Sequence, residues 1–198
     1  MFLLVGLSLY HGDASGLAMA AFPFGAVAWP EGSSNMGGTQ TSVYFAPLSA
    51  ITGWPDFAIS PATASERITK VGPFTMVNAT NFVKLYTTYK TGSYKADPEG
   101  DIDGSYFKQS GELFHPGSRA EAVEFANAVI NQPGVLIIVE ENGEMIMMGD
   151  NGHPCYIRPA FDLGKVGEGR KGFTFTAEAF STRAITRYSG DIPLVAAS

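Results

Sequence analysis

Cysteine and basic residues are scarce in this 198-residue chain, and the scarcity excludes several classes of protein. The single cysteine, Cys155, excludes an intramolecular disulfide framework. Only 16% of the residues are charged, the formal net charge is −6, and the first 66 residues hold four acidic residues and no lysine or arginine. Affinity for nucleic-acid phosphates comes from clustered lysine and arginine, so the composition argues against direct binding to a nucleic acid.

Long apolar runs are also lacking. The most apolar stretch near the start, residues 2–10, is too short for a transmembrane helix, which needs about 20 residues. It has the apolarity of a signal peptide but no basic residues before it, so we expect it to be retained and expect no membrane partner.

Turn-forming and β-forming residues are plentiful: there are 23 glycines, 12 prolines and 14 phenylalanines. This composition predicts a β-rich chain with frequent turns. Apolar alternation and turn residues predict strands that pair mainly as a meander, at 41–48, 57–59, 73–78, 82–90, 106–114, 155–158 and 173–180. The predicted strand at 106–114 is interrupted by Gly111. The strand at 173–180 is expected to have one buried and one wetter face.

The chain is predicted to consist of an extended N-terminal arm, residues 1–38, and a single domain, residues 39–198. The arm carries apolar side chains that need another surface to cover them. That surface belongs either to a neighbouring subunit or to the chain's own domain. The side chains concerned are Phe2, Leu3, Leu4, Phe22, Phe24 and Trp29.

One helix is predicted over residues 118–131. Ser118 and Glu121 have the spacing of a capping box, in which the two side chains bind free amides of the first turn. An apolar stripe follows at helical spacing, with Val123 and Ile130 widening it. Its central residues are Ala122, Phe125, Ala126 and Val129.

A β-hairpin is predicted directly after the helix, with strands at 135–141 and 144–148. Asn142 and Gly143 between them are the strongest short signal for a type I′ turn. We expect the helix to cover the sheet that contains this hairpin.

A long polar loop is predicted over residues 90–104, because this stretch is rich in glycine and charge. Its acidic residues are Asp97, Glu99, Asp101 and Asp103. They resemble the start of a calcium loop, but neither possible register supplies the full ligand pattern. A solvated acidic loop is the favoured interpretation.

Catalytic and cofactor signals are weak. Asp150, His153 and Cys155 lie close in sequence, but residues around one tight turn rarely converge with the geometry that nucleophilic catalysis requires. The three histidines are too far apart to predict a zinc site. The glycines of 164–172 follow no buried parallel strand and open no helix, so we expect a flexible loop. We therefore expect no enzyme, no metal and no cofactor.

The order of these elements resembles a known family. The residues that carry the resemblance are FKQSGEL at 107–113, then the helix, then VLIIVEENGEMIMMGDNG at 135–152, and finally KGFTFTAE at 171–178. This pattern is similar to the tail tube proteins of tailed bacteriophages and prophages of the Bacteroidetes. The fold that it implies is mainly β with one flanking helix (α+β), an antiparallel β-sandwich or barrel.

The function implied by the resemblance is that of a non-enzymatic virion structural protein. Rings, with six subunits as the expected number, would stack into a tail tube through which genomic DNA passes without specific binding. The implied partners are further copies of the chain, the tail terminator, the tape measure protein and the tail tip. The implied location is the virion tail, assembled in the host bacterial cytoplasm.

Within such a tube, the hairpin and the strand at 173–180 are expected to build the channel sheet, and the helix to brace the outside. The expected channel residues are those of the hairpin tip, Glu140, Glu141, Asn142, Gly143 and Glu144. The arm and the acidic loop are expected to mediate stacking. Two alternatives stay open: another phage ring or decoration protein (connector, tail terminator or capsid decoration), and a secreted β-sandwich binding module.

Overall fold

The computed structural model describes residues 27–29, 31–33, 35–77, 80–167 and 169–195. The chain divides into two units, Met1–Asn35 and Met36–Ser198. In the first unit, the described residues include a turn at Glu31 and Gly32, and the Trp29 side chain is 64% exposed. The second unit contains all the described helices and strands.

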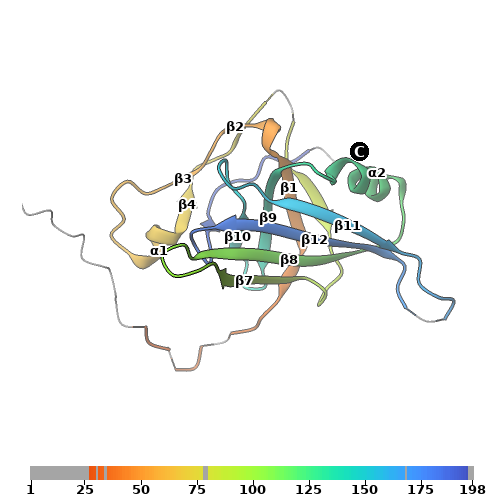
Figure 1. Ribbon diagram of the computed structural model, residues 1–198, viewed down its shortest axis with the longest axis horizontal. Coiled ribbons are helices and arrows are strands. Elements are labelled where there is room, and N and C mark those ends of the chain that lie inside the picture. Colours follow the sequence, from red (N-terminus) through yellow and green to blue (C-terminus); the bar gives the residue numbers. More distant parts are fainter. Residues whose placement is uncertain (1–26, 30, 34, 78–79, 168, 196–198) are drawn as a thin grey trace, which may run out of the picture. The chain divides into compact units, whose positions relative to one another are not determined.

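The second unit is mainly β, as predicted, and is built from two open, predominantly antiparallel sheets and a short ribbon (Figure 1). The larger sheet has seven strands, and its two ends do not join into a barrel. In order across the sheet these are β3 (Asp56–Phe57), β4 (Thr69–Val71), β13 (Arg187–Tyr188), β10 (Met145–Met148), β9 (Gly134–Glu140), β1 (Thr39–Pro47) and β6 (Val83–Tyr86). In this larger sheet β13 and β4 pair in parallel. The smaller sheet contains β11 (Tyr156–Asp162), β12 (Gly172–Ser181), β8 (Tyr106–Pro116) and β7 (Ser93–Glu99). The ribbon pairs β2 (Ile51–Gly53) with β5 (Thr75–Met76).

The strand order is not the predicted meander. β1 pairs with both β6 and β9, and β13 inserts between β4 and β10. Four connections pass from one of these two sheets to the other, after β6, β8, β10 and β12. Periodicity assigns residues to strands but carries no information on which strands pair, and this is why the meander was wrong.

The seven-stranded sheet is buried on both faces along β9, where six of the seven residues are buried. Leu136 and Ile138 pack into the core between the two sheets. Val135 and Ile137 pack into a second core with Phe74 on the opposite face. The continuous apolar run of β9 follows from this double burial, because a strand with one wet face would alternate.

A short helix, α1 (Ala64–Ile68), was not predicted, and it carries a capping box. The Glu66 amide donates to Thr63 Oγ1 at 3.2 Å, and the Glu66 carboxylate accepts from the amides of Ala62 and Thr63. These two backbone hydrogen bonds, that from Ala62 foremost, lower the pKa of Glu66. A 3-10 turn, η1 (Leu48–Ala50), follows β1.

The predicted helix exists as α2 (Ala120–Val129), shorter than 118–131 and without the predicted capping box. Arg119 is the N-cap residue, and no side chain caps the helix. Phe125 contacts Phe45 of the seven-stranded sheet and Phe175 of the four-stranded sheet, with ring centroids 6.0 and 5.5 Å apart. The helix thus packs against the core between the two sheets, and it contacts the sheet that contains the hairpin, as predicted, as well as the four-stranded sheet.

The buried stripe of α2 is narrower than predicted. Ala122, Ala126 and Val129 are buried, but Val123 and Ile130 are 37% and 54% exposed. Because the helix spans the gap between two sheets, only a narrow face reaches the core.

The predicted polar loop at 90–104 contains strand β7, which pairs with β8 along its whole length. Tyr94 and Ala96 are partly buried, whereas Lys95 and Asp97 are exposed. The Tyr94 hydroxyl donates to the carbonyl of Ala184 at 2.7 Å. The charges that suggested a loop are those of an edge strand with one wet face.

The predicted hairpin forms from β9 and β10, but its turn is not type I′. The Gly143 amide donates to the Glu140 carbonyl at 2.9 Å, and the Glu140 amide donates to the Glu144 carbonyl at 2.8 Å. Only Gly143 has a positive φ, of 89°, whereas a type I′ turn needs two such residues. The loop therefore has three residues, with Gly143 as its bulge.

Candidate assembly surfaces

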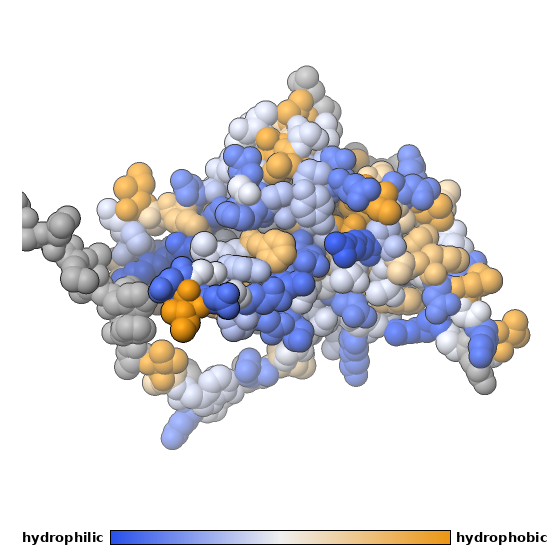
Figure 2. Space-filling model, in the orientation of Figure 1, coloured by the Kyte–Doolittle hydropathy of each residue, from blue (hydrophilic) through white to orange (hydrophobic). Residues whose placement is uncertain are grey.

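The outward face of the four-stranded sheet is open along all four of its strands, and we call it the open face. Its outward residues are Tyr156, Arg158, Ala160 and Asp162 on β11, Thr174, Thr176, Glu178 and Phe180 on β12, Tyr106, Lys108, Ser110, Glu112 and Phe114 on β8, and Ser93, Lys95, Asp97 and Glu99 on β7. None of these residues is buried. Figure 2 shows that this side of the molecule is mainly hydrophilic. Three basic and five acidic residues leave the open face with a formal charge of −2.

Cross-strand pairs hold the side chains of the open face in place. Lys108 Nζ lies 3.3 Å from Glu178 Oε1, and the rings of Tyr106 and Phe180 meet edge to face with centroids 5.6 Å apart. Such pairs contribute about 0.2–1 kcal/mol each. The open face is therefore a polar surface whose charges are partly paired within one subunit.

Gly111, at the centre of β8, does not interrupt the strand as the sequence suggested. A side chain there would meet Ile138 Cδ1 at 3.4 Å and Met148 Sδ at 3.5 Å. The glycine thus allows β8 to approach the seven-stranded sheet closely, while the strand continues without a break.

Both edges of the four-stranded sheet carry a proline, Pro98 in β7 and Pro159 in β11. Proline lacks the amide proton that a neighbouring strand would bind, so it is confined to edges and blunts them. On β11, Cys155 exchanges backbone hydrogen bonds with Gly134. In an antiparallel strand, alternate residues direct their backbone N–H and C=O groups to opposite sides. The backbone groups of Ile157 and Pro159 therefore point away from β12, as those of Cys155 do. These edges disfavour continuation of this sheet into a neighbouring subunit.

The predicted interface residues have different outcomes. Phe2, Leu3, Leu4, Phe22 and Phe24 lie outside the described residues. Asp97 and Glu99 are on β7, Asp101 and Asp103 are in the turn that follows, and all four are exposed. The structure thus brings the four acids together at one end of a β-hairpin.

The predicted channel sheet is not a single sheet. The hairpin β9–β10 belongs to the seven-stranded sheet, whereas β12 belongs to the four-stranded sheet. The strands of the hairpin are buried, so only its tip is accessible: Glu140 and Glu141 are partly exposed and Asn142, Gly143 and Glu144 are exposed. Glu144 forms an ion pair with Arg187 of β13. A role for the tip in a channel remains a prediction.

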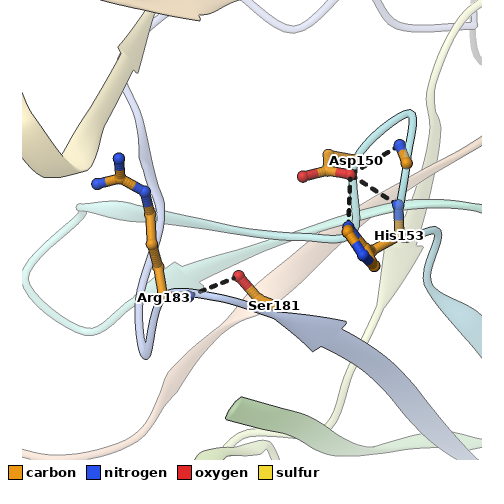
Figure 3. Close-up of polar contacts among 5 residues, drawn as sticks. Asp150, His153, Ser181 and Arg183 are labelled. Atoms are coloured by element: carbon orange, nitrogen blue, oxygen red, sulfur yellow. Dashed lines mark hydrogen bonds and ion pairs between the residues drawn. The ribbon is translucent and has the colours of Figure 1, made fainter. Parts of the chain in front are cut away.

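Asp150 and His153 contact each other at an exposed turn (Figure 3), whereas Cys155 is buried in the core, so the three do not form a catalytic arrangement. Asp150 Oδ1 accepts hydrogen bonds from the amides of Gly152 and His153, at 2.9 and 2.8 Å, and His153 Nδ1 lies 3.7 Å from the same oxygen. The guanidinium group of Arg183 points away from this pair. Asp150 therefore orders the turn between β10 and β11.

Cys155 is buried in the core between the sheets, and burial raises the pKa of its thiol to about 12. The thiolate is the reactive form, so the folded protein should react with a thiol reagent at pH 8 at least about a hundredfold more slowly than the unfolded protein. Labelling with and without denaturant measures this ratio. Fast labelling of the folded protein would contradict the burial of Cys155.

A shallow cleft of about 350 Å³ lies beside the same turn, lined by Trp54, Asp56, Lys70 and Asp150 among others. It combines one aromatic ring with two carboxylates and one ammonium group. Among the residues that the structure describes, no group of three or more histidine, cysteine or acidic side chains could hold a metal ion. Within the same residues, no helix is long and apolar enough to cross a membrane.

Only part of the open face was predicted from the sequence. The alternation of Phe173–Phe180 correctly predicted one buried and one wet face for β12. The contribution of β7 was missed, because a charged edge strand resembles a loop, and β11 was predicted as 155–158, too short at its C-terminal end. Recognising that Tyr94 and Ala96 alternate with Lys95 and Asp97 would have identified β7.

The chain matches no protein-family model, no curated protein sequence and no solved structure. Its class is therefore defined by its architecture: a mainly-β protein of two packed sheets with a flanking helix, in which the larger sheet is buried on both faces along β9 and the smaller sheet is open on one face.

Proposed function

We propose that this protein is a virion structural protein that self-assembles into stacked rings and forms the tail tube of a bacteriophage. The observation that carries the proposal is the open face, a continuous polar sheet surface with a formal charge of −2. A net acidic channel wall repels DNA and lets it slide, whereas a basic wall would retain it. The resemblance of residues 107–180 to tail tube proteins supports the same role.

In this proposal the four-stranded sheet, rather than the β9–β10 hairpin, lines the channel. β9 is buried on both faces and serves as the central support of the subunit. The proposed partners are further copies of the chain, the tail terminator, the tape measure protein and the tail tip, in the tail of a virion assembled in the host cytoplasm.

The edge prolines favour a second candidate, another phage ring or decoration protein. Pro98 and Pro159 hinder pairing of the four-stranded sheet between neighbours. Ring closure would then depend on side-chain contacts, and a single ring, or a subunit bound singly to a capsid, would be the final assembly.

Purification followed by light scattering and negative-stain imaging tests the proposal. We expect rings with a central hole that stack into tubes whose length grows with protein concentration. Single rings that never stack would favour the second candidate. A monomer that stays monomeric even with a tail-tip complex added would contradict both.

A further inference from the structure

The two hairpins of the four-stranded sheet turn at opposite ends of that sheet (Figure 1). The β7–β8 turn directly precedes Tyr106, the first residue of β8, and the β11–β12 turn directly precedes Gly172, the first residue of β12. β8 and β12 are antiparallel, with Gly172 opposite Pro116 and Ser181 opposite Phe107. An 11-residue strand separates the turns by about 33 Å.

One of these ends is acidic. We call Asp97, Glu99, Asp101 and Asp103 the acidic tip. Across residues 93–105 these four acids outweigh the single Lys95, so the formal charge is −3. Lys95 lies 3.6 Å from Asp97. Within the described part of the chain, the other three carboxylates have no cationic group within 4.0 Å, although Glu99 accepts a hydrogen bond from the Tyr106 hydroxyl.

The opposite end is basic. We call Lys165, Arg170 and Lys171 the basic tip, and all three are exposed. Across residues 163–171 they outweigh a single acid, Glu168, so the formal charge is +2. The Arg170 guanidinium lies over the Phe114 ring, 4.5 Å from its centroid. Among the described residues, none of the three cations has a carboxylate within 4.0 Å.

We propose that the acidic tip of one copy binds the basic tip of the next copy, head to tail. Opposite charges that lack partners within their own subunit complement each other across such a contact. Each tip also presents a fully accessible apolar side chain, Ile102 at 93% and Val166 at 106% exposure, which would be covered in the contact.

The geometry makes this contact one that propagates. Two different surfaces on opposite ends of one subunit form a heterologous interface, which continues from copy to copy instead of closing a dimer. The inference rests on the proposed function, in which this contact between the two tips joins one ring to the next ring of the stack. It also extends that function by naming both surfaces.

Charge reversal at each tip tests the proposal. The acid-reversed variant carries Glu99→Lys and Asp101→Lys, and it leaves Asp103 intact because that residue has a φ of 68°. The base-reversed variant carries Lys165→Glu and Lys171→Glu, which leaves Arg170 on its ring. Each variant alone should self-associate at least about tenfold more weakly than the unmodified protein in sedimentation experiments, since like charges then meet.

An equimolar mixture of the two variants should restore association, because each altered tip now meets its complement. A control with the same charge change as the acid-reversed variant, Glu121→Lys and Glu124→Lys on the exposed face of α2, should associate like the unmodified protein. Circular dichroism checks that every variant is folded. Raising the salt concentration from about 0.05 M to about 0.5 M should weaken association of the unmodified protein.

The outcomes separate this inference from the proposed function. Variants that stack as well as the unmodified protein, or a mixture that does not recover, would overturn the inference and leave tube formation standing. If the unmodified protein formed linear chains without rings, and each charge reversal abolished those chains, the inference would be supported and the proposed tail tube would be overturned. An unmodified protein that never associates would overturn both.

Discussion

Replacing Ile137 with alanine should destabilise the protein about as much as replacing Ile138, although the two side chains point to opposite faces of β9. Ile137 is 0% exposed and Ile138 is 1% exposed, and each packs in a different core. Removal of a buried isoleucine side chain to alanine costs about 2–5 kcal/mol, from lost burial and the cavity left behind. Chemical denaturation of both variants measures the two free energies of unfolding.

Thr176→Ala is the matched control, because Thr176 is an exposed residue on the open face. It should change the free energy of unfolding by less than about 0.5 kcal/mol. If Ile137→Ala behaved like this control while Ile138→Ala did not, the second core would not be packed as described. The seven-stranded sheet would then have one wet face.

Deleting residues 1–9 should leave the β domain folded but block tube growth. Every described helix and strand lies within Met36–Ser198, so the removed residues contribute none of them. The deleted stretch is almost wholly apolar, and in the proposed tube it covers a surface of a neighbouring subunit. Circular dichroism reports the fold, and negative-stain imaging with turbidity reports tube yield.

A variant with the same nine positions replaced by glycine and serine separates apolarity from length. We expect it to behave like the deletion, with folded subunits and no tubes. Unchanged tube yield in either variant would remove the arm from assembly. Unfolding of either variant would instead assign the stretch to the subunit's own core, which is the other alternative that the sequence left open.

Local features of the fold were predictable from local patterns. Strands β12 and β9 were identified from the alternation along Phe173–Phe180 and from the apolar run Val135 to Val139. A strand buried on one face alternates apolar and polar residues, and a strand buried on both faces is continuously apolar. The glycine of the β9–β10 turn was also correctly placed. The type of that turn was wrong, because the bulge depends on which residues pair across the strands.

Capping signals show where local reasoning fails. The same spacing of a hydroxyl residue and a glutamate occurs at Ser118 and at Thr63, but only Thr63 forms the capping box. The chain entering α2 instead follows β8, and Gly117 donates its amide to the carbonyl of Lys171. This long-range contact lies just before α2, and no local pattern contains it.

The candidate surfaces were predictable in chemistry but not in position. The acidic residues after Lys95 were recognised as an assembly candidate, yet their placement opposite Lys165 and Lys171 depends on the antiparallel pairing of β8 with β12. Those strands are separated in sequence by α2, β9, β10 and β11. Only the pairing shows that the two tips lie at opposite ends of one sheet.

The insertion of β13 between β4 and β10 has a consequence for synthesis of the chain. Arg187 pairs with Thr69 on one side and with Ile146 on the other, and Phe82 exchanges backbone hydrogen bonds with Pro193 and Val195. Contacts of such large sequence separation slow folding, because long loops must close first. The seven-stranded sheet is therefore completed only after residues 187–195 have left the ribosome, so β4 and β10 remain without the strand between them until that point of synthesis.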